Sequence, residues 1–426
     1  MNTVSMTVDK GLCCSCGVCK GICPKECISF RRENGMFLPV IDENACVECG
    51  LCAAVCPGLG HPYEEKDSAA ATITGEYLEC FNAWSQDAKT RHVSASGGVI
   101  STLIPELLRQ GRYDGAFCLD SYDYRSQLKT RLYGQHEWES WADSNAPKSR
   151  YLPVSQEETV RTIREHAEKK LIIVGTSCAL RGIEAAIRKL NRNRENYLLI
   201  GLFCDKVFNY NAIAYWQDRY CGGNALEKLH FKNKESGGWP GDMKFFPENA
   251  DSFYVPLGER ARMKRYFMPE RCLYCVDKLN VLADISLGDN YTNTASSPLG
   301  SNSVMLRTQR GLDAWNAVRE KLESVPVGVD EIQEAQGLSI RLQNLYAGDL
   351  TRMELNPGVP RERPAQELKK FREQERMRLR TGAAYDREPS ALHRQLKRDN
   401  SPPALPLRAI RFAKRCLRAL WRKFCS

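Results

Sequence analysis

A cysteine spacing that occurs twice near the N-terminus constrains this chain more than any other feature. The two copies are Cys13-x2-Cys16-x2-Cys19-x3-Cys23-Pro24 and Cys46-x2-Cys49-x2-Cys52-x3-Cys56-Pro57. This spacing is typical of bacterial ferredoxins with two 4Fe–4S clusters. Three closely spaced thiolates bind one cluster, and the fourth cysteine of each copy binds the other cluster.

The spacing therefore predicts two sets of iron ligands. The first set is Cys13, Cys16, Cys19 and Cys56, and the second is Cys46, Cys49, Cys52 and Cys23. Zinc sites and disulfides are the alternatives, but paired zinc knuckles need neither the third cysteine nor the proline in both copies. Cys14 and Cys27 lie outside the pattern and are predicted to be spare thiols. Residues 1–65 are expected to form this ferredoxin domain.

Composition limits the remaining classes. The 426 residues suggest two or three domains, and 42% of them are hydrophobic, which is enough for real cores. No apolar run approaches the ~18 residues of a membrane-spanning helix, and the first residues do not resemble a signal peptide. We therefore expect a cytoplasmic protein, in which the nineteen cysteines are more often metal ligands than disulfides.

The net charge of +9 comes mainly from the last twenty residues. Seven basic residues and no acidic residue lie there, so the rest of the chain carries only +2. This distribution gives little support to a nucleic-acid-binding protein, and no nucleic-acid partner is expected.

A small, polar segment of the central region precedes an apolar run. After a linker over about 58–74, the chain reads Ser94-Ala95-Ser96-Gly97-Gly98 and then continues with apolar residues at helical spacing. Small residues at a helix N-terminus let backbone N–H groups approach a phosphate. The alternative is an ordinary serine N-cap with flexible glycines.

A strand–helix–strand unit follows. Residues 171–174 and 197–203 predict buried strands, and residues 179–190 predict the helix between them. The two strands should be parallel. Cys178 and Cys204 would then lie at the carboxyl ends of these strands, where open α/β sheets bind ligands.

Two more cysteines can complete a site at that edge. Cys272 and Cys275 form a C-x2-C pair, which alone fits a zinc knuckle, a redox pair or half of a cluster site. We predict that Cys178, Cys204, Cys272 and Cys275 bind a third 4Fe–4S cluster. The alternative is that Cys178 and Cys204 are ordinary buried thiols. Cys80, Cys118 and Cys221 have no partner at useful spacing and are expected in the core.

With these segments, residues 10–345 resemble the coenzyme F420 hydrogenase/dehydrogenase beta-subunit family. The matching segments, beside the ferredoxin run, are Ser96-Gly97-Gly98-Val99, Lys148-Ser149-Arg150-Tyr151, Gly175-Thr176-Ser177-Cys178, Gly201-Leu202-Phe203-Cys204, Gly238-Trp239, Cys272-Leu273-Tyr274-Cys275-Val276-Asp277, Ala283-Asp284-Ile285-Ser286-Leu287-Gly288-Asp289 and Gly300-Ser301-Asn302-Ser303.

The resemblance implies a flavoprotein that passes electrons between iron–sulfur clusters and FAD, and on to coenzyme F420 or another small organic acceptor. It also implies a redox partner such as ferredoxin or a neighbouring subunit. The expected FAD contacts are Ser94, Ser96, Gly97, Gly98, Lys148, Ser149, Arg150 and Tyr151. A flavin exchanges two electrons as a hydride and releases them singly, so no acid–base catalytic residues are assigned.

The predicted fold class is α+β. It comprises an N-terminal bacterial-type ferredoxin domain, an α/β flavin-binding domain of this family's type over 75–345, and a C-terminal helical tail. Residues 356–400 are rich in charge and predict an exposed helix or linker. Residues 403–426 predict a basic amphipathic helix, which suits the inner face of the cell membrane, a partner protein or this protein's own body.

The leading hypothesis is thus an iron–sulfur flavoprotein oxidoreductase. One alternative is a non-catalytic electron-transfer or adaptor subunit that the tail holds at a membrane. The other is a zinc-stabilised α/β protein.

Overall fold

A computed structural model describes residues 3–59, 73–119, 123–138, 148–339 and 366–400. The basic segment 403–426 lies outside these residues, so the predicted amphipathic helix and its membrane contact stay predictions. Among the described helices, none combines the length and the apolar character that crossing a membrane requires.

The N-terminal unit is built from short elements that leave its cysteines in loops. Its helices and strands are α1 (Ser5–Asp9), α2 (Val18–Ile22), β1 (Ile28–Glu33), β2 (Met36–Ile41), α3 (Leu51–Ala54) and the 3-10 turn η1 (Pro57–Leu59). β1 and β2 form an antiparallel hairpin. Gly17 and Gly50 precede α2 and α3 with φ of +72° each, the left-handed conformation that glycine tolerates best.

The central unit is an eight-stranded mixed sheet with the order β13-β3-β12-β11-β7-β6-β4-β5. Its strands are β3 (Glu79–Ser85), β4 (Gly115–Leu119), β5 (Thr130–Tyr133), β6 (Leu171–Thr176), β7 (Tyr197–Leu202), β11 (Ile285–Asp289), β12 (Asn302–Leu306) and β13 (Leu322–Pro326). The four central strands are parallel to one another, and the outer pairs are antiparallel.

The predicted strand–helix–strand unit is confirmed. β6 and β7 pair in parallel, and α9 (Ser177–Lys189) connects them. Their side chains alternate between two cores because successive residues of a strand point to opposite faces. Ile172 and Leu198 pack on the side of α6 (Val99–Arg109), and Ile173 and Leu199 pack on the side of α9.

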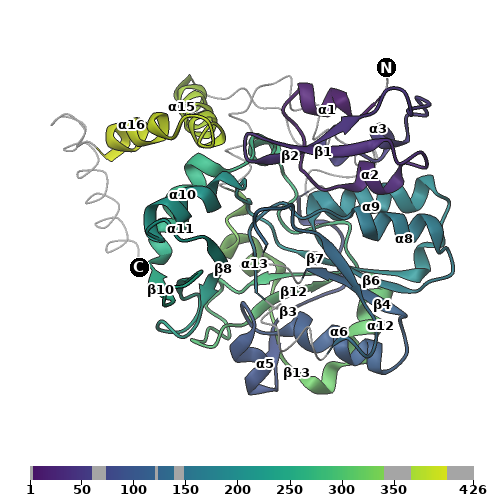
Figure 1. Cartoon of the computed structure of the whole chain (residues 1–426). Helices are drawn as coiled ribbons and strands as arrows, with labels where there is room; N and C mark the ends of the chain where they lie inside the picture. The colour runs from purple at the N-terminus through teal and green to yellow at the C-terminus, as the bar shows by residue number, and fades with distance from the viewer. Residues whose placement is uncertain (1–2, 60–72, 120–122, 139–147, 340–365, 401–426) are drawn as a thin grey trace.

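Helices therefore cover both faces of the sheet, as Figure 1 shows. α6 and α12 (Gln309–Asn316) lie on one face, and α8 (Glu157–Glu165) and α9 lie on the other. The remaining elements of this unit are α5 (Ala88–Val93), η2 (Arg194–Asn196), η4 (Arg319–Lys321) and α13 (Val329–Ala335).

The N-terminal unit packs directly on the second face. Val18 and Ile22 of α2 belong to the same core as Val160 of α8 and Ile183 of α9. Gln156 donates its backbone N–H to the carbonyl of Cys16 at 2.7 Å, and Lys20 forms an ion pair with Glu157 at 3.1 Å.

A second, smaller sheet lies beside the large one. β8 (Leu226–Asn233), β9 (Asp242–Pro247) and β10 (Phe253–Val255) form it, with α10 (Asn211–Tyr220), α11 (Leu257–Phe267) and η3 (Glu270–Tyr274) nearby. This sheet was not predicted, because its strands mix polar and apolar residues without a regular alternation.

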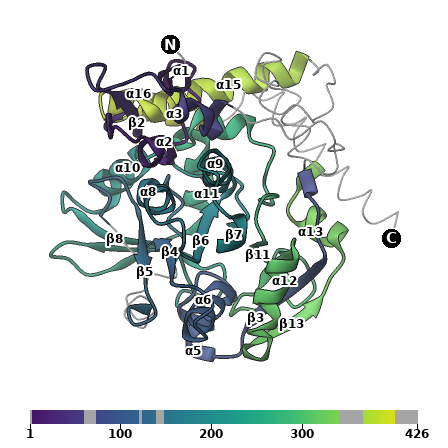
Figure 2. The same cartoon turned by 90° about the vertical axis from the view of Figure 1, so that its right-hand side faces the viewer.

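Residues 366–400 of the charged C-terminal segment form two helices, the helix alternative of the prediction, and some of their side chains pack on the body. α15 (Gln366–Ala383) contacts α11, and α16 (Pro389–Asn400) follows it. Leu379 and Leu392 are buried, and Arg387 donates to the Asn34 side chain of the N-terminal unit. Figure 2 shows the two helices beside that unit.

Candidate functional site

The structure brings the first predicted ligand set together. Cys13, Cys16, Cys19 and Cys56 lie near enough to influence one another electrostatically. Burial raises the pKa of the Cys13 thiol to about 12, and it also raises the pKa values of Cys16 and Cys19. Iron binding must therefore displace protons from these thiols.

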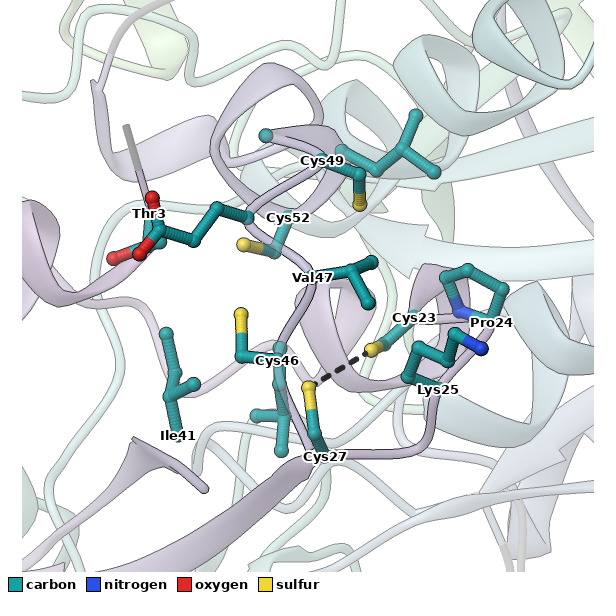
Figure 3. A pocket seen from close by; sticks show the side chains of 14 residues that line it. Thr3, Cys23, Pro24, Lys25, Cys27, Ile41, Cys46, Val47, Cys49 and Cys52 are labelled. Carbon is teal, nitrogen blue, oxygen red and sulfur yellow. Dashed lines mark hydrogen bonds between the residues drawn. The ribbon is translucent and has the colours of Figure 1, made fainter. Parts of the chain in front are cut away.

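The second predicted set surrounds a separate cavity. Cys23, Cys46, Cys49 and Cys52 line it, and Figure 3 shows them around one space. Cys27, predicted to be a spare thiol, lines the same cavity with its sulfur 3.4 Å from that of Cys23. This set faces outward, because Cys49 is exposed and Val47 is 59% exposed.

The third predicted set meets at the carboxyl edge of the large sheet. Thr176 pairs with Leu202 in the β6–β7 register, so Cys178 and Cys204 each follow the end of the paired strands by two residues. Cys272 lies on η3 and Cys275 is its C-cap residue. All four cysteines line one cavity of about 340 Å³.

The Cys178 thiol is more acidic than an ordinary cysteine thiol. Its contact with Cys14 lowers its pKa to about 6, and Thr176, Arg271 and the backbone at Ala179 act in the same direction against burial. Cys178 lies in the first turn of α9, where the helix dipole favours a thiolate. Burial instead raises the pKa of Cys272 to about 12.

The same cavity extends to the residues predicted to contact FAD. Seven of the eight line it, namely Ser94, Ser96, Gly98, Lys148, Ser149, Arg150 and Tyr151. The eighth, Gly97, lies against the sheet instead, since a Cβ there would stand 2.7 Å from the carbonyl oxygen of Ala83. The volume of the cavity is within the roughly 300–1,000 Å³ of small-molecule sites.

Backbone and side-chain contacts fix the position of the residues at the start of α6. Its N-cap is Gly98, at φ +84°, and no side chain caps the helix, so the serine N-cap alternative is wrong. Ser96 Oγ donates to the carbonyl of Ser301 at 2.6 Å, and buried Lys234 donates to the carbonyls of Arg91 and Ser96. The N–H of Val99 donates to Asn302 Oδ1 at 3.5 Å. The first residues of α6, Val99, Ile100 and Ser101, line the cavity, and a helix N-terminus at such a place favours an anion.

Cations surround the Lys148–Tyr151 segment. Burial lowers the pKa of Lys148 to about 8. Tyr151 has a φ of +49°, and Lys232, Arg260 and Lys264 lie 5.0 to 5.9 Å from its ring centre. Left-handed backbone at a non-glycine residue is strained, and such strain occurs often at functional sites.

The cavity wall contains residues that were not predicted as site residues, among them Cys14, Lys232 and Arg271. Cys14 was predicted to be a spare thiol but contacts Cys178. Lys232 pairs with Asp289, and Arg271 is buried among the thiols. The sequence hinted at two of these residues only through their position beside predicted ligands: Cys14 follows Cys13, and Arg271 precedes Cys272.

The donor sets fit iron–sulfur clusters better than single ions. Within the described part of the chain, no three Cys, His, Asp or Glu side chains are close enough to hold one metal ion. The thiolates of a 4Fe–4S cluster bind four different iron atoms, so they stand further apart than the ligands of a single ion.

Family models match most of the regions described above. Residues 80–134 and 168–328 match the N-terminal and C-terminal models of the coenzyme F420 hydrogenase/dehydrogenase beta subunit, about half of the chain together. Residues 39–58, which contain the second cysteine run, match a 4Fe–4S binding domain.

Individual relatives are distant. A subunit of the F(420)H(2) dehydrogenase of Methanosarcina mazei is 23% identical over 75% of this chain and 86% of its own. The coenzyme F420-dependent sulfite reductase of Methanocaldococcus jannaschii is 24% identical over 78% of this chain, but the match spans only 50% of that relative. A chain in a solved structure of the F420-reducing NiFe hydrogenase complex from Methanosarcina barkeri is 20% identical, with a TM-score of 0.47, over 65% of this chain and 94% of that one.

The cysteine geometry and the family models agree on an electron-transfer protein with a 4Fe–4S domain. The chain belongs to the coenzyme F420 hydrogenase/dehydrogenase beta-subunit family.

Proposed function

We propose that this chain is an iron–sulfur flavoprotein oxidoreductase. Electrons pass between two ferredoxin-type 4Fe–4S clusters, a third 4Fe–4S cluster and FAD, and on to coenzyme F420 or another small organic acceptor. Cys13, Cys16, Cys19 and Cys56 hold the first cluster, and Cys46, Cys49, Cys52 and Cys23 hold the second. Cys178, Cys204, Cys272 and Cys275 hold the third.

One observation carries the proposal. A single cavity is lined at once by the four sheet-edge thiols, by Cys16 of the first ligand set and by seven of the eight predicted FAD contacts. This arrangement would place the third cluster and the flavin in one cavity, with the first ligand set next to it. A flavin in this cavity would supply the conversion between two-electron and one-electron chemistry.

The residues of the chain have distinct roles in this arrangement. Lys234 positions the Ser94–Gly98 segment through its two carbonyl contacts, and the start of α6 binds a phosphate of FAD. Lys148 and Arg150 supply positive charge on the facing segment. Apolar side chains of the cavity wall, such as buried Leu287 and partly buried Val174, exclude water from the centres.

The outward-facing second set supports a redox partner. Cys49 and Val47 are exposed beside it, which gives an electron donor or neighbouring subunit access to this cluster. Two of the relatives are themselves named as subunits of an F(420)H(2) dehydrogenase and of a coenzyme F420 hydrogenase.

Anaerobic purification with measurement of iron, sulfide and flavin tests the proposal. We expect about twelve iron atoms and one FAD per chain, since three 4Fe–4S clusters hold four irons each. The variant Cys178→Ser should retain about eight irons. The control Cys221→Ser, a buried cysteine outside the three ligand sets, should retain about twelve.

Other outcomes separate the candidate functions. About twelve irons without flavin would contradict the flavoenzyme and favour a non-catalytic electron-transfer subunit. About eight irons in the unmodified protein would contradict the third cluster. If FAD is present, reduction of F420 compared with other acceptors identifies the substrate.

A further inference from the structure

Arg271 is a buried cation whose charge is not balanced by any carboxylate in the part of the chain that the structure describes. Its residue is only 9% exposed, and its Nη2 donates to the carbonyl of Pro57 at 3.4 Å. Within the described residues, Nε and Nη1 have no hydrogen-bond partner, and no carboxylate lies at ion-pair distance from the guanidinium. Burying unpaired N–H groups and an unpaired charge is costly, so the position calls for an anionic partner.

The surroundings of Arg271 identify that partner. Arg271 lines the large cavity with Cys14, Cys178 and Cys272. The carboxylates on the cavity wall are engaged elsewhere: Asp277 faces Arg181 at 3.5 Å, Asp289 pairs with Lys232, and Asp205 lies 3.3 Å from Lys264. The sulfur atoms of the third cysteine set line the same cavity and become thiolates when they bind iron, so they are the partners left for Arg271.

Arg271 also lies at the junction of two sites. Pro57, whose carbonyl it contacts, directly follows Cys56 of the first ligand set, and Cys272 of the third set directly follows Arg271. One guanidinium therefore stands between the ferredoxin unit and the sheet edge.

We propose that Arg271 tunes the reduction potential of the third cluster by donating Nε–H and Nη1–H to its sulfur atoms. This inference rests on the proposed third cluster. A cluster with four thiolates is anionic and gains one further negative charge when it takes up one electron, so a buried cation favours the reduced state. Arg271 thereby makes this site a better electron acceptor from the first cluster, and it is a positioning and charge-tuning residue.

Redox titration of the full chain, purified anaerobically with its clusters and followed by EPR, tests the proposal. In Arg271→Gln we expect at least a tenfold shift of the third cluster's one-electron equilibrium toward the oxidised state, which is about 59 mV. Arg271→Lys, which keeps the charge, should shift it by less. The second cluster, in its separate cavity, is an internal reference and should not move.

A matched control tests whether the effect comes from the charge of Arg271 in the cavity or only from an arginine that holds η3 in place. Arg376 contacts the same 3-10 helix from α15 through the Tyr274 hydroxyl, at 3.0 Å, but does not line the cavity. Arg376→Gln should leave the potential of the third cluster unchanged.

The outcomes are distinguishable. Three clusters in Arg271→Gln with an unchanged potential overturn the role of Arg271 and leave the proposed function intact. About eight irons in the unmodified chain overturn both. If Arg271→Gln loses the third cluster, Arg271→Lys decides: retention of the cluster there supports the charge role, and loss in both variants shows a role in folding alone.

Discussion

At the scale of single residues, the flavin end of the cavity depends on cations in unusual environments. Lys234 is 6% exposed, and burial, together with the nearby charges of Lys148, Arg91 and Lys232, lowers its pKa to about 7. Its contacts with the carbonyls of Arg91 and Ser96 connect the small sheet to the start of α6. Lys234 is thus a buried amine next to the start of α6, where the phosphate of FAD is proposed to bind. Buried groups with strongly shifted pKa values are typical of binding sites.

Lys234 makes stability dependent on pH. Its pKa of about 7 in the folded protein lies below the 10.5 of an ordinary lysine, so between these values the unfolded chain binds more protons than the folded chain. The flavin-free protein should therefore become more stable relative to Lys234→Met as pH rises from 7 to 10, by up to about 1.4 kcal/mol per pH unit. Urea unfolding of both proteins at each pH measures this difference, and parallel curves would contradict the lowered pKa.

At the scale of elements, the approach of α6 to the sheet requires glycine at one position. A Cβ at Gly97 would stand 2.7 Å from the carbonyl oxygen of Ala83 on β3 and 2.8 Å from Oδ1 of Asn302 on β12. Neither neighbour can yield easily, because both residues belong to paired strands. The position of Gly97 therefore fixes how closely the start of α6 lies to the cavity edge.

Gly97→Ala should move this segment away from the strands. We expect a loss of about 1–3 kcal/mol in the free energy of unfolding, as for other overpacked sites, and at least a tenfold loss of FAD affinity. Gly111→Ala, at the other end of the same helix, is the control. No atom lies within 4 Å of its added Cβ, and its φ of +66° gives only local strain. Equal FAD affinity in both variants would show that α6 does not contact the cofactor.

At the scale of the whole molecule, the ferredoxin unit is part of the site. α2 packs against α8 and α9, and Cys16 of its first ligand set reaches the wall of the large cavity. Close packing here needs Gly21, because a Cβ at this residue would stand 2.4 Å from the carbonyl oxygen of Glu157. In the proposed arrangement, the docking of α2 on α8 would therefore set the distance between the clusters and the flavin.

Gly21→Val should push the ferredoxin unit away from α8. We expect iron content to be retained and the rate of flavin reduction by the reduced clusters to fall at least tenfold, because electron transfer depends steeply on distance. Stopped-flow absorbance measures this rate. The control Gly258→Val places the same side chain where no atom lies within 4 Å, and it should react like the unmodified protein. An unchanged rate in Gly21→Val would contradict a path through this interface.

Features that depend on local spacing could be predicted from the amino-acid sequence. The two cysteine runs predict their ligand sets because neighbouring residues of a loop must bind one cluster, and apolar runs predicted β6 and β7 because buried parallel strands are apolar on both faces. The edge position of Cys178 and Cys204 followed from strand direction alone.

Which distant residues meet became clear only from the folded chain. The contact of Cys14 with Cys178, the burial of Arg271 beside Pro57 and the support of Ser96 by Lys234 join residues from separate elements. The packing of α15 and α16 on the body likewise depends on isolated apolar residues such as Leu379 and Leu392 within charged helices. Such contacts arise from how whole elements pack, and a few apolar residues within a charged helix give too weak a periodic pattern to identify the surface on which the helix packs.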